Sequence, residues 1–120
     1  MDMEDLRKEF LRKIADMGGQ AFKQNRLQGF PEMMVIIPGG LFGFVEIIPK
    51  SERVPEIVRK RIKELRTLGC AACRLSEEKE IDSVIMYILT RAGKDPDFYR
   101  FKIERRRLET ESHVDKELEP

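Results

Sequence analysis

Two acidic residues, Glu32 and Glu46, are the best candidates for chemistry in this sequence. They are the only acidic residues between Gly29 and Lys50, and the pattern of that stretch, described below, places them directly opposite each other on paired strands. Facing side chains in a sheet have Cβ atoms about 4.5–5.5 Å apart, and like charges at that separation are destabilising unless something neutralises them. Such a pair can bind a divalent cation through its oxygens. Alternatively, it needs a Lys or Arg side chain between the carboxylates.

The stretch that carries both carboxylates is predicted to be a β-hairpin. Two apolar runs, 33–37 and 41–48, flank a Pro-Gly-Gly sequence at 38–40. A three-residue loop that contains glycine is a common hairpin connection. With this loop, the last residue of the first run faces the first residue of the second. Counting outward from that pair in antiparallel register brings the two acidic residues face to face.

The order of these motifs resembles that of the small phage-type VRR-NUC domains of the PD-(D/E)xK nuclease superfamily. The resemblance lies in Gly29-x-Pro31-Glu32, the Pro-Gly-Gly hairpin, Phe44-Val45-Glu46 and a basic helix that ends in Leu68-Gly69, and it covers roughly residues 4–90. It implies a restriction-endonuclease-like α/β/α sandwich with a mixed sheet of about four strands. The nuclease-like domain is expected at 1–93, followed by a helical extension and a charged, disordered tail at 94–120.

The resemblance also implies an eroded active site. Nucleases of this type hold divalent ions with carboxylates and orient the attacking water with a lysine. Glu46 matches the family pattern, but the family aspartate is Glu32 here and the lysine position is Ile48. The helix glutamine of the family falls near Val58, and the glutamate of its first helix falls on Arg7. We therefore expect an impaired nuclease relative with no cofactor.

An active enzyme is the alternative, and it depends on Lys50. Glu46, Ile48 and Lys50 share one face of the strand, which places Lys50 about 6.6 Å beyond the usual lysine position. A displaced site would use Glu32, Glu46 and Lys50 as catalytic residues, with Glu32 and Glu46 holding Mg²⁺ or Mn²⁺. The reaction would be metal-dependent endonucleolytic cleavage.

Charge is distributed unevenly along the chain, although its net value is only +1. Residues 50–75 carry a net charge of +5 and residues 91–107 a net charge of +4, whereas 108–120 carry −4. This pattern fits a nucleic-acid footprint partly masked by an acidic tail, or simply the charged faces of solvated helices. The predicted phosphate-binding residues are Arg59, Lys60, Lys63, Arg105, Arg106 and Arg107.

Three functions follow from these observations. The first is an impaired nuclease relative that binds DNA, RNA or a nucleic-acid-processing protein, as an accessory of a phage or mobile element or as an inhibitor of host defence. The second is the active endonuclease. The third is a structural module that forms a homodimer through its sheet or helices. No apolar run approaches the length of a membrane span, so we expect a cytoplasmic protein without membrane contact.

The remaining elements must position this hairpin. The 120 residues suffice for one domain, and Ser76 is expected to cap the last helix of the nuclease-like unit. Cys70 and Cys73 lack a second pair of metal ligands and are interpreted as small core residues in a reducing compartment. The periodicity predicts helices at 3–17, 55–68 and 77–92 and strands at 20–24 and 70–75.

Overall fold

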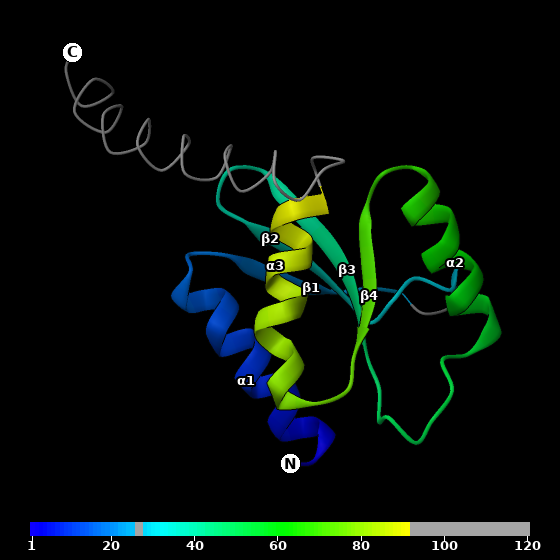
Figure 1. Ribbon diagram of the computed structural model, residues 1–120, viewed down its shortest axis with the longest axis horizontal. Helices are drawn as coiled ribbons and strands as arrows, with labels where there is room; N and C mark the ends of the chain where they lie inside the picture. Colours follow the sequence, from blue (N-terminus) through cyan, green and yellow to red (C-terminus); the bar gives the residue numbers. More distant parts are fainter. Residues whose placement is uncertain (26–27, 92–120) are drawn as a thin grey trace.

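The computed structural model describes residues 1–25 and 28–91, which form an α/β fold on one mixed sheet. The spatial order of its four strands is β1-β2-β3-β4; β3 and β4 are parallel, and the other neighbours are antiparallel (Figure 1). This confirms the predicted fold class. The elements are α1 (Met3–Asp16), β1 (Gln20–Lys23), β2 (Met33–Ile37), β3 (Leu41–Ile47), α2 (Glu56–Thr67), β4 (Ala71–Leu75), the 3-10 helix η2 (Glu78–Glu80) and α3 (Ile81–Arg91).

The predicted hairpin is present with the predicted register. Ile37 pairs with Leu41, and Met33 pairs with Val45 at the far end. The loop between the strands needs glycine, because the φ angles at 39 and 40 are 98° and 76°, in the region that side chains disfavour. One step beyond the last pair lie the two acidic residues.

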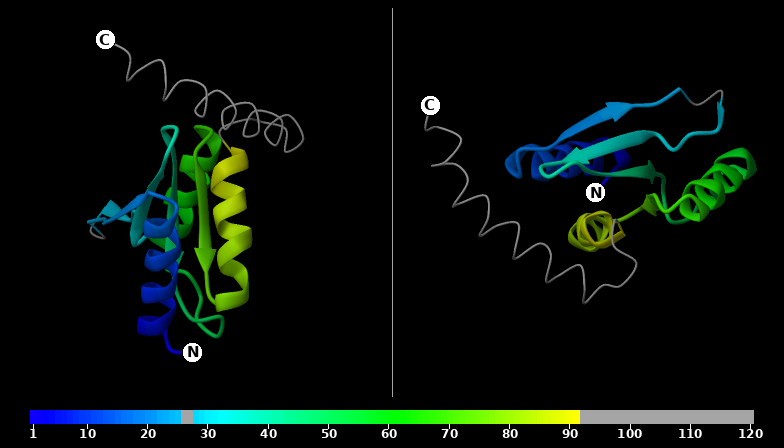
Figure 2. Two further views of the ribbon diagram at one scale, coloured as in Figure 1. Left: turned by 90° about the vertical axis from the view of Figure 1, so that its left-hand side faces the viewer. Right: turned by 90° about the horizontal axis from the view of Figure 1, so that it is seen from above.

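The helices cover the two faces of the sheet unequally. α1 and α3 lie together on one face, and α2 lies on the other, against β3 and β4 (Figures 1 and 2). The first face carries the larger core, in which the α1 stripe of Leu6, Phe10 and Ile14 is fully buried. The second core is smaller and centres on Phe44, Leu65 and Ala72. α2 is the crossover that joins the parallel strands β3 and β4.

β4 forms one edge of the sheet, and side chains from both neighbouring helices contact its backbone. The Arg66 Nε donates to the carbonyl oxygen of Ala72 at 2.7 Å. The Tyr87 hydroxyl lies 3.4 Å from both the nitrogen and the oxygen of Ala72. An arginine of α2 and a tyrosine of α3 therefore share the polar groups of this one residue.

The start of the last helix differs from the prediction. Ser76 is not its cap: its hydroxyl accepts a hydrogen bond from the Arg74 Nε at 2.9 Å. The Glu80 carboxylate instead reaches back to the backbone N–H groups of Ser76 and Glu77, each at 2.9 Å. Glu77 and Glu80 form a capping box around η2, which leads into α3. The glutamate at 80 thus moves the cap one residue along the chain.

Candidate functional site

The two hairpin glutamates lie together, as the register predicted. Glu32 precedes β2 and Glu46 lies near the end of β3, and their exposed fractions are 5% and 1%. The Glu46 Oε1 accepts a hydrogen bond from the backbone N–H of Glu32 at 2.8 Å. One carboxylate therefore fixes the backbone that carries the other. Burying two like charges so close together requires a compensating cation.

Arg7 of α1 supplies that cation. Its Nε donates to the Glu32 Oε1 at 2.6 Å, and its Nη2 lies 3.4 Å from the Glu32 Oε2. The hydrogen bond to Glu32 is the main cause of a raised pKa at Arg7, and the charge of Glu46 adds to it. Of the two interpretations that the sequence left open, the structure shows the arginine. Arg7 also stands where the family resemblance implies a metal-binding glutamate.

An apolar cluster occupies the positions where the family resemblance implies a lysine and a glutamine. Ile48 and Val58 are 7% and 2% exposed and belong to one buried cluster with Val54. The two departures from the family pattern are therefore coupled, because the side chains pack in the same place. A lysine and a glutamine would each bury a polar group there.

Lys50, the proposed displaced lysine, makes its ion pair elsewhere. Its ammonium lies 3.5 Å from the Glu77 Oε1, and its side chain is 69% exposed. Lys79 also pairs with Glu77, at 3.3 Å. The contacts of the described residues thus join Arg7 to Glu32 and Glu32 to Glu46, and they join Lys50 to Glu77 at the start of η2.

The acidic pair does not fit a divalent metal ion. A Mg²⁺ or Mn²⁺ site needs several free oxygen ligands. Here one carboxylate receives an arginine and the other a backbone N–H. Within residues 1–25 and 28–91, no three His, Cys, Asp or Glu side chains are grouped so as to hold a metal.

The glycine of the Gly-x-Pro-Glu motif has a packing role. Gly29 has a φ of 75°, and a Cβ on it would lie 2.7 Å from the Cγ1 and 2.9 Å from the carbonyl oxygen of Ile57. The loop that leads to Glu32 therefore lies directly against α2. Arg61 strengthens this contact, since its guanidinium donates to the Gln28 carbonyl and stacks over the Phe30 ring.

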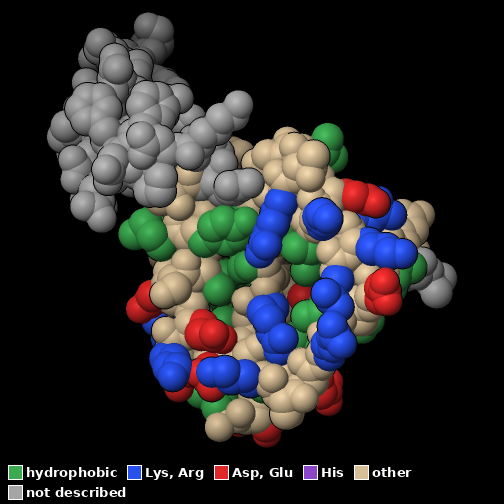
Figure 3. Space-filling model, turned by 45° about the vertical axis from the view of Figure 1, so that its right-hand side comes forward, with side chains coloured by type: hydrophobic (Ala, Val, Ile, Leu, Met, Phe, Trp, Pro, Cys, Tyr) green, Lys and Arg blue, Asp and Glu red, His purple; other side chains and the backbone are tan. Residues whose placement is uncertain are grey.

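A second feature is a basic hollow between α2 and β4. Its volume is about 580 Å³, and Lys and Arg side chains gather around it on the face shown in Figure 3. Val54 and Ile62 contribute apolar surface, and Cys73 also lines the hollow although its side chain packs against the larger core. Burial raises the pKa of the Cys73 thiol to about 12, so this residue is neutral at ordinary pH. The basic residues that line the hollow are Arg59, Lys63, Arg66 and Arg74.

The basic residues predicted from sequence have different surroundings. Arg59 and Lys63 both line the hollow, whereas Lys60 is outside its described lining and lies 4.0 Å from Glu56. The predicted contacts at 105–107 fall outside the described residues.

Sequence reasoning missed the contribution of β4 to the hollow. Arg74 was hidden within a strand interpreted as buried core, yet it lies beside Glu46 in the parallel register. A charged residue in an otherwise apolar edge strand was the signal that could have identified it. Arg66 was visible on the polar face of α2, but its hydrogen bond to Ala72 depends on tertiary structure.

Comparison with known proteins supports the fold. No family model matches the sequence, and no curated protein matches it significantly. A solved structure described as a "VRR_NUC domain" is similar to this chain, with a TM-score of 0.64 and 21% identity. The similarity covers 69% of this chain and 92% of that one. The chain therefore has a VRR-NUC-like nuclease fold. None of the described helices is long and apolar enough to cross a membrane.

Proposed function

We propose that this protein is a nuclease-fold relative that has lost phosphodiester cleavage and binds nucleic acid through the basic face of α2. The observation that carries the loss of cleavage is the Arg7–Glu32 ion pair beside Glu46. An arginine there neutralises the carboxylates that a metal would need. Ile48 stands where the family resemblance implies the lysine that would activate water, and it is buried in an apolar cluster with Val58.

The support for binding comes from charges that remain available. The guanidinium of Arg59 and the ammonium of Lys63 have no ion-pair partner among the described residues. They lie one turn apart on α2, so both project from the same side of the helix. Unpaired cations on one face are the electrostatic footprint of a phosphate-binding surface.

The test combines two assays on the intact chain. DNA and RNA mobility shifts should show binding that weakens as salt rises, while Mn²⁺ and Mg²⁺ produce no cleavage of the same substrates. Metal-dependent cleavage that Glu46→Gln abolishes would establish the active enzyme instead. Failure to bind DNA and RNA at low salt would refute nucleic-acid binding and favour a nucleic-acid-processing protein as the partner, in a phage, mobile-element or defence context.

A second candidate function, a homodimerisation module, is favoured by exposed apolar side chains on the sheet. Phe22, Ile36 and Phe42 are 42%, 38% and 45% exposed. Their register places them on one face, beyond the part of the sheet that α2 covers. Sedimentation should then show a dimer that Phe42→Ser weakens, with Leu68→Ser, another exposed apolar residue, as the control.

A further inference from the structure

The basic hollow contains two kinds of cation. Arg66 and Arg74 are held by the protein itself: Arg66 donates to Ala72, and the Arg74 Nη2 donates to the carbonyl oxygens of Pro49 at 2.7 Å and Glu52 at 3.2 Å. Arg59 and Lys63 have no such partner within the described part of the chain. The hollow thus combines fixed positive charge with two cations that are free to meet a ligand.

Its lining is selective in charge. The described residues that line the hollow include four cations and no carboxylate. Converging positive charge in a concave surface attracts anions more strongly than the same charges on a flat surface. Arginine also offers a planar fork of donors that matches phosphate oxygens. A phosphate group is therefore the anion that this chemistry suits best.

The size of the hollow and its apolar floor indicate a ligand that is larger than a phosphate group. The volume of about 580 Å³ lies in the range of small-molecule sites. Val54 and Ile62 offer apolar surface that a bare inorganic anion would not use. A sugar and base attached to the phosphate would use it, and a guanidinium plane can stack on a base.

We propose that the hollow between α2 and β4 binds one nucleotide of a single-stranded nucleic acid, with its phosphate at Arg59 and Lys63 and its base and sugar over Val54 and Ile62. The inference rests on the proposed nucleic-acid binding and specifies its substrate. A single strand is favoured over a duplex because its bases can turn outward to reach the floor, whereas duplex bases are stacked inside. Neither Arg7 nor Glu32 lines the hollow, so the acidic pair and its arginine take no part.

Two lysines of α2 provide a matched test. Lys63 lines the hollow, whereas Lys60 is outside its described lining, so Lys63→Gln and Lys60→Gln remove the same charge from the same helix. Fluorescence anisotropy would measure the affinity of each variant for a labelled single strand of about 12 nucleotides, within the site sizes of single-strand binders. Thermal melts would confirm that both variants are folded.

The expected result is a loss of about tenfold in single-strand affinity for Lys63→Gln and less than about twofold for Lys60→Gln. Lys63→Gln should also reduce the salt slope by about 0.7, the value for one phosphate contact to a single strand. In wild-type protein, amide NMR signals of Ile62 and Cys73 should shift with the single strand. A blunt duplex of the same sequence should bind more weakly and leave those signals unchanged.

Three results would overturn the inference. Equal losses for the two lysine variants would indicate diffuse electrostatic binding, with the proposed function intact. If the blunt duplex binds as tightly as the single strand, the hollow does not bind a nucleotide whose base is turned outward. Millimolar mononucleotide could also displace the labelled strand. If it does so as effectively per phosphate as an unlabelled strand, the hollow binds free nucleotides. If wild-type protein binds no nucleic acid at low salt, the proposed function itself fails.

Discussion

The acidic pair and the basic hollow use charge in opposite ways. Glu32 and Glu46 are buried, and protein groups satisfy both carboxylates, with Arg7 supplying the charge. In the hollow, Arg59 and Lys63 remain without an ion-pair partner among the described residues. The first arrangement is complete without a ligand, whereas the second is the proposed phosphate-binding surface. Because function depends on the site and not on the fold, a binding surface of a nuclease fold need not lie where its carboxylates lie.

The largest expected effect comes from removing Arg7. Arg7→Met keeps most of the apolar stem but leaves the buried carboxylates without their cation, so we expect a loss of about 2–3 kcal/mol in the free energy of unfolding. Urea denaturation would measure it. Adding Glu32→Gln to this variant should recover part of the loss, because the second change removes the uncompensated charge.

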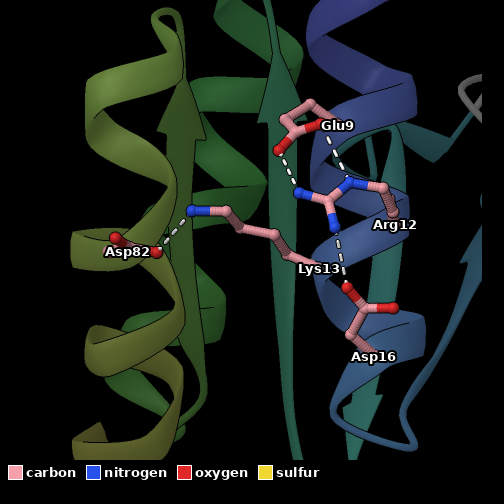
Figure 4. Close-up of polar contacts among 5 residues, drawn as sticks. All are labelled: Glu9, Arg12, Lys13, Asp16 and Asp82. Atoms are coloured by element: carbon pink, nitrogen blue, oxygen red, sulfur yellow. Dashed lines mark hydrogen bonds and ion pairs between the residues drawn. The ribbon is translucent and has the colours of Figure 1, made fainter.

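Arg12 provides the matched control on the same helix. It pairs with Glu9 and Asp16 on the exposed side of α1, while Lys13 reaches Asp82 of α3 (Figure 4). Because solvent screens exposed pairs, Arg12→Met should change the urea midpoint little. Equal effects of Arg7→Met and Arg12→Met would contradict the view that the acidic pair depends on Arg7.

The next prediction concerns a variant in which the carboxylates at 32 and 46 are free to bind a metal ion. Combining Arg7→Glu, Glu32→Asp and Ile48→Lys restores three of the four residue types that the family resemblance implies. We expect Mn²⁺ to stabilise this variant by about 2.7 kcal/mol at a concentration of 100 times its Kd, and to leave the wild-type protein unaffected. Thermal unfolding with and without Mn²⁺ would measure this. Arg12→Glu makes a similar charge change on α1 and should gain no stabilisation; an equal gain there would show non-specific metal binding.

The smallest expected effect concerns the Lys50 region. The hydrogen bond from Lys79, with further help from Lys50, lowers the pKa of Glu77 from its ordinary 4.5. A carboxyl with a lowered pKa in the folded state adds stability above its unfolded pKa and loses it as pH falls through the folded value. The urea midpoint of the wild-type protein should therefore fall as the pH drops below 4.5. This fall should be smaller in Glu77→Gln and unchanged in Glu78→Gln. An unchanged fall in Glu77→Gln would mean that the ion pairs of Glu77 with Lys79 and Lys50 contribute nothing there.

The hairpin could be predicted from sequence because its determinants are local. The Pro-Gly-Gly loop sets the register, and a period of two then places Glu32 beside Glu46. The partner of that pair could not be decided in the same way. Arg7 lies 25 residues from Glu32, and only the packing of α1 on the sheet brings them together.

The hollow was less predictable for a related reason. The helical period reveals that Arg59 and Lys63 share a face, but it says nothing about what lies opposite. The other wall comes from β4, whose Arg74 is held by carbonyl groups of the loop before α2. This wall of the hollow depends on the order of the strands in the sheet. A short stretch of residues does not determine that order.

The contacts at Ala72 have a consequence for self-association. An edge strand presents backbone groups that can template a strand from another molecule, but Arg66 and Tyr87 already engage the carbonyl and the N–H of Ala72 in β4. A second copy that extended the sheet at this edge would have to displace both side chains. Growth into continuous intermolecular sheets is therefore disfavoured at β4.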